Sequence, residues 1–94
     1  MFFTYILKSA KNSRYYIGYT ENMLSRLSLH NAKKVTSTKH DTPWELFHVE
    51  EFKTEKEAIN RERQIKSWKS RKAIERLKFK QNDPDNLLSR TLDF

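Results

Sequence analysis

A glutamate occupies the middle of an apolar helical line in the second half of the chain. Glu62 follows Ala58 by four residues and precedes Ile65 by three, so these side chains project from one face of a helix. Burying a carboxylate costs free energy unless it is paired or binds a cation. The commoner interpretation is a salt bridge, with Arg26 or Lys66 as the partner. The other interpretation is a site for a bound cation.

Two tyrosines and an arginine in the first third of the chain suit chemistry on a phosphate. Tyr5 and Tyr16 are eleven residues apart across an expected hairpin. If they pair across it, their rings lie on one face of adjacent strands, which is a common structural device. Their hydroxyls can instead hold a water or a phosphate oxygen. Arg26, expected to be exposed at one end of this face, offers a planar fork of donors for a phosphate or makes a weak surface ion pair.

The histidines favour acid–base chemistry over zinc binding. His30 comes four residues after Arg26, so both project from one side of a helix. His30 is a candidate acid, base or hydrogen-bond donor. His30, His40 and His48 have no metal-ligand spacing, and the chain has no cysteine, which argues against zinc. The sequence also lacks a glycine-rich phosphate loop, which argues against nucleotide-dependent kinases and ATPases. It has no Gly-x-Ser-x-Gly motif, so a serine hydrolase has no support.

The positive charge of the chain is concentrated in one segment. Nineteen Lys and Arg against twelve Asp and Glu give a net charge of +7. Residues 53–80 hold eleven basic and four acidic side chains, and the remaining residues cancel. Such a patch favours a polyanion, because each neutralised phosphate releases counterions. The alternative is a solvated surface that keeps the protein soluble.

The elements that must position these residues follow from hydrophobic periodicity and turn signals. At 94 residues the chain fits one domain. We predict a three-stranded, mainly antiparallel sheet flanked by helices, an α/β domain of the α+β kind in the order β-β-α-β-α-α. The predicted strands are 2–8, 14–19 and 44–52. The helices are 22–33, one capped by Thr54, and one capped by Ser70.

Taken in order, these residues resemble the GIY-YIG nuclease superfamily over about residues 2–80. The likeness is greatest to small stand-alone bacterial proteins similar to the N-terminal nuclease domain of the repair protein UvrC. The motifs are Phe3-Thr4-Tyr5, Tyr16-Ile17-Gly18, Leu24-Ser25-Arg26-Leu27, His30-Asn31 and Glu57-Ala58-Ile59-Asn60-Arg61-Glu62. Two positions depart from the pattern: Tyr19 stands where lysine is frequent, and Ile74 lies near the place of an asparagine in some relatives.

The resemblance implies an endonuclease that hydrolyses the phosphodiester bonds of nucleic acids. We expect DNA rather than RNA as the substrate, and cutting that is either structure-selective or nonspecific. Glu62 would bind one Mg²⁺ or Mn²⁺, and Arg26 would stabilise charge on the phosphate. Tyr5 or Tyr16 would act on the attacking water, and His30 could share that duty. Ile17 and Gly18 would complete the structural motif.

Exposed basic residues would hold the nucleic-acid backbone on either side of the site. The candidates are Lys33, Lys34, Lys39, Arg63, Lys66, Lys69, Arg71 and Lys72. Residues 1–80 would form the nuclease unit, and residues 81–94 a tail that docks on it or on a protein partner that supplies specificity.

Two alternative functions remain open at the level of sequence. One is a nucleic-acid-binding module that keeps the fold without useful catalysis, and the other is an interaction domain that uses the apolar tail Leu87 to Phe94. The lack of cysteine, of a signal peptide and of a long apolar segment favours a cytoplasmic protein without a membrane partner.

Overall fold

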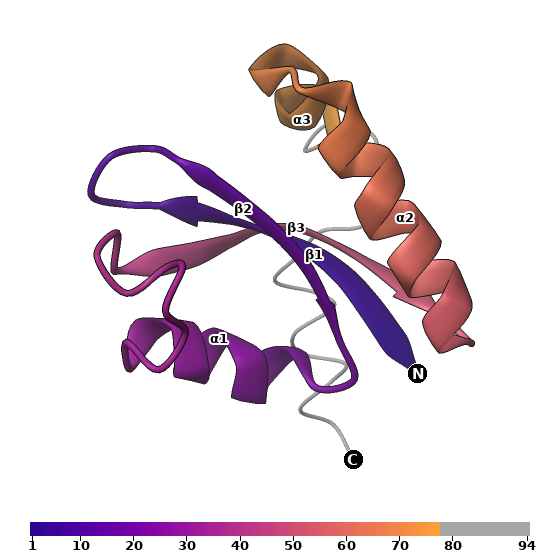
Figure 1. Ribbon diagram of the computed structural model, residues 1–94, viewed down its shortest axis with the longest axis horizontal. Coiled ribbons are helices and arrows are strands. Elements are labelled where there is room, and N and C mark those ends of the chain that lie inside the picture. The colour runs from indigo at the N-terminus through magenta and orange to yellow at the C-terminus, as the bar shows by residue number, and fades with distance from the viewer. Residues whose placement is uncertain (78–94) are drawn as a thin grey trace.

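The computed structural model describes residues 1–77, which form the predicted α+β domain in the predicted element order (Figure 1). The elements are β1 (Phe2–Ser9), β2 (Tyr15–Thr20), α1 (Met23–Asn31), β3 (Trp44–Phe52), α2 (Glu55–Trp68) and α3 (Arg71–Leu77). The predicted tail, residues 81–94, lies outside the described residues. Among residues 1–77, no helix combines the length and the apolar character needed to cross a bilayer.

The sheet has the strand order β2-β1-β3, and both pairs are antiparallel. Its register corrects one expectation, because Tyr5 lies opposite Gly18, and Tyr16 lies opposite Leu7. The two tyrosines are therefore diagonal neighbours and not a direct pair. Since alternate residues of a strand share a face, both rings still lie on one side of the sheet, with centroids 6.3 Å apart.

Helices cover both faces of the sheet, α1 on one side and α2 with α3 on the other (Figure 1). Alternate residues of β1 supply the two cores. Phe3, Tyr5 and Leu7 pack toward α1, where the buried cluster also holds Met23, Trp44 and Val49. Ile6 points the other way and packs with Phe47, Ile65, Ile74 and Leu77. The two-residue period of β1 thus fixes which side chains can reach α1 and which can reach α2.

All three predicted caps are present. The Asn22 side chain accepts a hydrogen bond from Ser25 N at the start of α1. Thr54 accepts one from Glu57 N at the start of α2, and Ser70 accepts one from Ala73 N at the start of α3. These bonds satisfy backbone donors that a helix leaves unpaired at its first turn.

Helix α1 ends at Asn31, two residues before the predicted end. The Asn31 side chain accepts a hydrogen bond from Trp44 N (2.6 Å) and donates one to Trp44 O (3.0 Å), so it joins the end of the helix to the start of β3. Lys33 has a positive φ of 61° and turns the chain away. Sequence periodicity does not reveal a helix end that is set by a contact with a residue distant in the chain.

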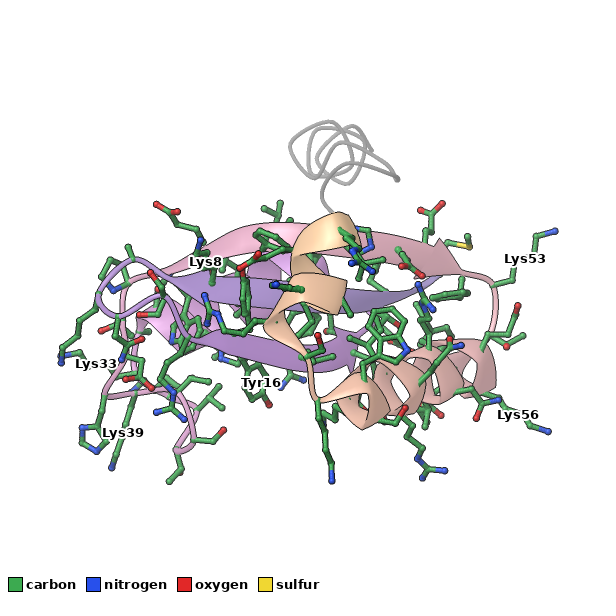
Figure 2. The ribbon with its side chains drawn as sticks, turned by 90° about the horizontal axis from the view of Figure 1, so that it is seen from above. Lys8, Tyr16, Lys33, Lys39, Lys53 and Lys56 are labelled. Atoms are coloured by element: carbon green, nitrogen blue, oxygen red, sulfur yellow. The ribbon has the colours of Figure 1, made fainter. Side chains whose placement is uncertain are left out.

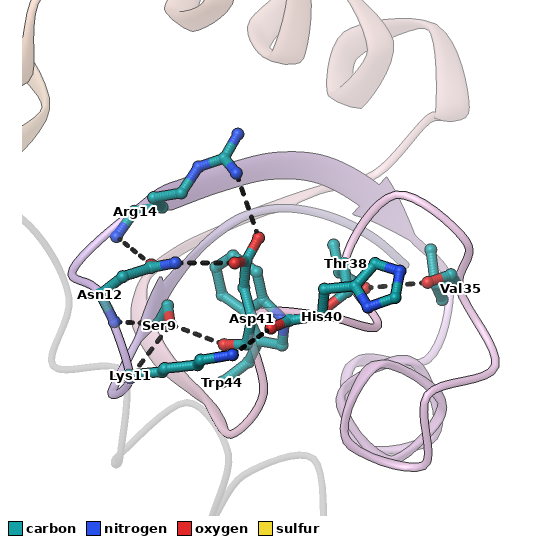
Figure 3. A network of polar contacts seen from close by, with 9 residues as sticks. All are labelled: Ser9, Lys11, Asn12, Arg14, Val35, Thr38, His40, Asp41 and Trp44. Atoms are coloured by element: carbon teal, nitrogen blue, oxygen red, sulfur yellow. Dashed lines mark hydrogen bonds and ion pairs between the residues drawn. The ribbon is translucent and has the colours of Figure 1, made fainter.

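The loop between α1 and β3 is tied to the turn between β1 and β2 (Figure 3). The carbonyl of Asp41 accepts a hydrogen bond from Ser9 Oγ (2.6 Å), and its carboxylate accepts one from Asn12 Nδ2 (2.7 Å) and pairs with Arg14 (3.3 Å). Lys11 Nζ also donates to the carbonyl of His40. This polar loop is therefore a fixed part of the domain, although its composition predicted only an irregular segment.

A second polar network joins β3 to α2 on the other face. Glu50 pairs with His48 Nε2 at 2.8 Å and with Arg61 Nε at 2.8 Å, and the Arg61 guanidinium lies 5.3 Å from the centre of the Trp68 ring. Burial raises the pKa of the Glu50 carboxyl, but the hydrogen bonds from His48 and Arg61 outweigh it and leave this pKa below its usual value. The charged form of Glu50 is therefore favoured by the fold.

Replacing Glu50 with glutamine is expected to destabilise the domain more at neutral than at acid pH. A carboxyl whose folded pKa is depressed stabilises the fold above its unfolded pKa, about 4.3, and this contribution disappears as the pH falls through the folded pKa. Urea unfolding of wild type and Glu50→Gln at pH 7 and pH 3 measures the difference. An equal loss of unfolding free energy at both pH values would contradict the assignment.

Candidate active site

One pocket of about 560 Å³ brings together four of the five predicted catalytic residues. Tyr5 of β1, Tyr16 of β2, Arg26 of α1 and Glu62 of α2 all line it. Because β2 is an outer strand of the sheet, side chains from α1 and from α2 can meet around its free edge. The remaining lining residues are Phe2, Gly18, Tyr19, Thr20, Glu21, Asn22, Ser25, Leu29 and Glu55.

Gly18 makes room for the ring of Tyr5. A Cβ atom on Gly18 would lie 2.6 Å from Tyr5 Oη and 2.7 Å from Tyr5 Cζ, closer than real Cβ contacts. The φ of Gly18 is not positive, so the backbone conformation does not require glycine here. The only glycine of the chain stands in a strand because a neighbouring aromatic ring lies across it.

Tyr5 begins a buried chain of hydrogen bonds that ends at a backbone carbonyl. Tyr5 Oη lies 3.0 Å from His30 Nε2, and His30 Nδ1 lies 2.8 Å from Thr38 Oγ1. Thr38 Oγ1 donates to the carbonyl of Val35 at 3.4 Å (Figure 3). In the tautomer with the hydrogen on Nδ1, which this direction of the Thr38 hydroxyl requires because a carbonyl only accepts, His30 Nε2 accepts from Tyr5. The Tyr5 hydroxyl proton therefore points away from the pocket, toward His30.

Burial keeps both members of this pair neutral. Burial, followed by the neighbouring Tyr16 and Glu62, raises the pKa of the Tyr5 hydroxyl well above its usual value, against the opposing effect of Arg26. Burial and Arg26 lower the pKa of the His30 imidazole. At neutral pH, Tyr5 is therefore a neutral phenol, and His30 is a neutral imidazole whose free electron pair can accept the hydrogen bond of the Tyr5 hydroxyl.

His30 itself does not line the pocket and lies behind Tyr5, fully buried. Its ring centroid is 5.9 Å from that of Tyr5 and 4.9 Å from that of Tyr16. Arg26, one turn earlier on α1, is half-buried and does line the pocket, which corrects the expectation that it would be exposed. The two side chains share a helix face as predicted, but at different depths.

Glu62 is paired and also faces the pocket. Lys66 Nζ lies 3.3 Å from Glu62 Oε2, and the Glu62 side chain is 16% exposed while that of Lys66 is 53% exposed. The predicted salt bridge with Lys66 is therefore confirmed, and Arg26 is not the partner found. The pair does not remove Glu62 from the site, since the carboxylate lines the pocket.

The pocket offers a few oxygen ligands of the kind that a hard divalent cation prefers. Such a cation would keep water molecules as most of its ligands. Within residues 1–77 no three His, Cys, Asp or Glu side chains are grouped so that they could hold a metal ion, which speaks against a closed protein cage. Mg²⁺ is commonly held by one or two carboxylates and keeps several waters. Glu62, with tyrosine hydroxyls in the same pocket, fits that ligand set.

The predicted nucleic-acid contacts fall into separate groups, and all eight side chains are exposed. Lys33 and Lys39 lie at one end of the domain, and Lys53 and Lys56, which are not among the predicted contacts, lie at the other (Figure 2). Lys34 follows Lys33 in the α1–β3 loop. Lys66, Lys69 and Arg71 line a second pocket, and Arg63 and Lys72 line neither pocket.

Thr38 and Arg14 are the residues that sequence reasoning missed. Thr38 is a buried threonine in a polar loop, and its carbonyl also accepts a hydrogen bond from Trp44 Nε1 at 2.9 Å. Arg14 lines the second pocket. Neither has a sequence signal, because both roles depend on contacts between segments that are distant in the chain.

The class of domain follows from this pocket together with a comparison to known families. The sequence pattern of the family described as "GIY-YIG catalytic domain" matches residues 1–77. The chain therefore belongs to the GIY-YIG family, as its motifs predicted, and this membership supports a nuclease-type function.

Within that family, the chain is similar to small proteins called UPF0213. The protein from Bacillus pumilus (strain SAFR-032) is 39% identical over 69 residues, which are 72% of this chain and 69% of the relative. The protein from Streptococcus pneumoniae serotype 4 is 34% identical over 88 residues, or 93% of this chain and 86% of the relative. The one from Bacillus velezensis is 32% identical over 92 residues, with 97% and 92% covered. No solved structure matches the chain significantly.

Proposed function

We propose that this chain is a metal-dependent endonuclease that hydrolyses phosphodiester bonds in DNA, structure-selectively or without sequence preference. The observation that carries the proposal is the convergence of Tyr5, Tyr16, Arg26 and Glu62 on one pocket from four different elements. None of these side chains is informative alone. Together they provide an acidic ligand, a fixed positive charge and two hydroxyls around a space that a phosphate can enter.

Glu62 is the residue that would hold Mg²⁺ or Mn²⁺. When bound, such a cation polarises a phosphate oxygen and stabilises charge on the leaving 3′ oxygen. Lys66, which pairs with Glu62, holds the carboxylate in position before the substrate arrives. Arg26 lines the same pocket, and its permanent positive charge stabilises the negative charge that grows on the phosphate in the transition state.

Tyr5 is our choice for the group that takes a proton from the attacking water. A free tyrosine is a poor base, and burial makes the Tyr5 phenolate still less accessible. The hydrogen bond to His30 removes this obstacle, because Tyr5 passes its own proton to His30 Nε2 as it accepts one from the water. Thr38 then holds the His30 Nδ1–H. Tyr16 would orient the water from the neighbouring strand.

The exposed basic side chains would attract the backbone and align it. Phosphate contacts set the register of a nucleic acid but carry little sequence information. Specificity would then come from the shape of the substrate or from a protein partner. We place this activity in the cytoplasm. This assignment favours branched or distorted DNA over a particular sequence.

Cutting of supercoiled plasmid and of a branched DNA by the wild-type chain, with Mg²⁺, with Mn²⁺ or with a chelator, tests the proposal. We expect nicks in either metal and none with the chelator. Equal cutting with the chelator would contradict metal dependence. Salt-sensitive binding without cutting in either metal would instead identify a binding module on the same fold.

Replacing Thr38 with valine is expected to lower the cutting rate by about tenfold with little change in KM. Valine has a similar shape but leaves His30 Nδ1 without an acceptor, so the imidazole is no longer held ready for the Tyr5 proton. Thr38→Ser keeps the hydroxyl and should restore most of the rate. Because the pKa of His30 is lowered by burial and by Arg26, the acid limb of the wild-type rate profile should lie below about pH 6.5.

If the role of Thr38 were purely structural, the cutting rates of the two variants would follow another pattern. Serine and valine would then lower the rate in proportion to the thermal stability that each loses. Single-turnover cutting rates over a range of pH, with melting temperatures of the same samples, separate the two patterns.

A further inference from the structure

A second pocket, of about 360 Å³, lies where the end of α2 and the start of α3 meet β2. We call it the α2–α3 pocket. Four cationic side chains line it, Arg14, Lys66, Lys69 and Arg71, and no acidic residue does. Its other lining residues are Tyr15, Ile17, Ile65, Ser70 and Ile74. A hollow with an apolar floor and a cationic rim suits an anion whose neighbouring groups are apolar or aromatic.

The two arginines of this pocket are held in place by the fold. Arg71 Nη1 donates to the carbonyl of Ser13 at 2.9 Å, and the Arg71 guanidinium lies 4.7 Å from the centre of the Tyr15 ring. Arg14 is paired with Asp41 at 3.3 Å. Arg71 also lies 3.9 Å from Glu75, a weak contact between exposed side chains. Such fixed guanidinium groups lose less freedom on binding a phosphate than free side chains do.

Lys66 connects the α2–α3 pocket to the candidate active site. It lines the α2–α3 pocket, and its ammonium group contacts Glu62, which lines the other pocket. Lys66 and Glu62 are four residues apart on α2, so these two lining residues lie about 6 Å apart along the helix axis. That step is short enough for consecutive phosphates of one strand to reach both.

We propose that the α2–α3 pocket binds backbone phosphates that flank the bond to be cut. This inference depends on the proposed nuclease function for the identity of the ligand. The strand would leave the active-site pocket over Lys66, along the free edge of β2, and place the next phosphates against Lys69, Arg14 and Arg71. An acidic peptide is the less suitable ligand, because the adjoining pocket already offers the groups expected around a phosphodiester.

Two charge-removing variants test this path at side chains that do not line the active-site pocket. Lys69 has left-handed backbone angles (φ 49°, ψ 35°) at the end of α2, a conformation that asparagine tolerates, so Lys69→Asn preserves the fold. Arg14→Gln removes a side chain that is 70% exposed. Lys53→Gln is the matched control. It removes the same charge two residues before the start of α2, about 20 Å from Lys66 along a helix that rises 1.5 Å per residue.

The measurement is the affinity for fluorescent single-stranded and branched DNA, by anisotropy, in chelator and over about 50 to 200 mM salt. Each pocket variant should weaken binding several-fold more than Lys53→Gln. Each should also reduce the slope of log K against log salt by about 0.7 to 0.9, the value of one lost phosphate contact. In the double variant, the reduction of this slope should be about twice as large.

The outcomes separate this inference from the proposed function. If the wild type cuts DNA but both variants keep the slope of Lys53→Gln, the phosphate path is wrong and the nuclease assignment stands. If the variants reduce the salt dependence of binding and the wild type does not cut, the pocket binds phosphate as proposed but the nuclease assignment is wrong. A wild type that does not bind DNA under these conditions would overturn both.

Discussion

Replacing Glu62 with glutamine is expected to lower the rate of metal-dependent cutting by about 10³-fold and to leave the fold intact. Glutamine keeps the shape of the side chain but removes the charge that would hold the cation, so stabilisation of the leaving oxygen is lost with it. The effect on stability should be small. The ion pair with Lys66 is an i,i+4 pair at a helix surface, and such pairs contribute about 0.3–0.5 kcal/mol.

Glu57→Gln is the matched control for this variant. Glu57 is on the same helix, is exposed, and forms the capping box with Thr54, a position that accepts glutamine equally well. Initial nicking rates of both variants at saturating Mg²⁺ give the comparison. If Glu62→Gln keeps a rate similar to that of Glu57→Gln, then Glu62 is a structural residue and the cation has another site.

Replacing Gly18 with alanine is expected to destabilise the domain by about 2–3 kcal/mol, the cost of overpacking a core, and to reduce cutting by more than about 10²-fold. The new methyl group would lie 2.6 Å from Tyr5 Oη. Tyr5 is 2% exposed and packed among other core residues, so its ring cannot move aside freely. Any shift breaks the 3.0 Å hydrogen bond to His30 and moves the hydroxyl within the pocket.

The cause of the Gly18→Ala effect is tested by removing the ring that it meets. In a Tyr5→Leu background the methyl group has no phenol to displace, so Gly18→Ala should cost much less there, a non-additivity typical of residues in contact. Urea unfolding of the two single variants and the double variant measures it. The same loss in both backgrounds would show that Gly18 is required for another reason.

Local patterns were sufficient to predict the elements of the fold. The alternation in β1 and the caps Asn22, Thr54 and Ser70 each depend on residues within a few positions of one another, so they can be identified in the sequence. Glu62 could be singled out for the same reason, because helical periodicity alone placed a carboxylate among apolar positions. The family motifs then connected it with Tyr5, Tyr16 and Arg26.

Contacts between distant segments could not be predicted in this way. The register that sets Tyr5 opposite Gly18 depends on the β1–β2 turn, where Ser13 has a positive φ of 64°, and a different turn would have changed every cross-strand pair. Thr38 reaches His30 only because the α1–β3 loop is anchored to that same turn. The split of the basic residues into separate groups likewise depends on how α2 and α3 pack on β2.

Nuclear magnetic resonance with added Mn²⁺ tests whether the pocket around Glu62 binds a cation, because the paramagnetic ion broadens the signals of nearby residues whether or not the protein cuts. We expect broadening centred on Tyr16, Gly18, Arg26 and Glu62 in the wild type, little at Lys33 or Lys53, and loss of this pattern in Glu62→Gln. Broadening centred elsewhere, or a pattern unchanged by Glu62→Gln, would contradict cation binding by Glu62.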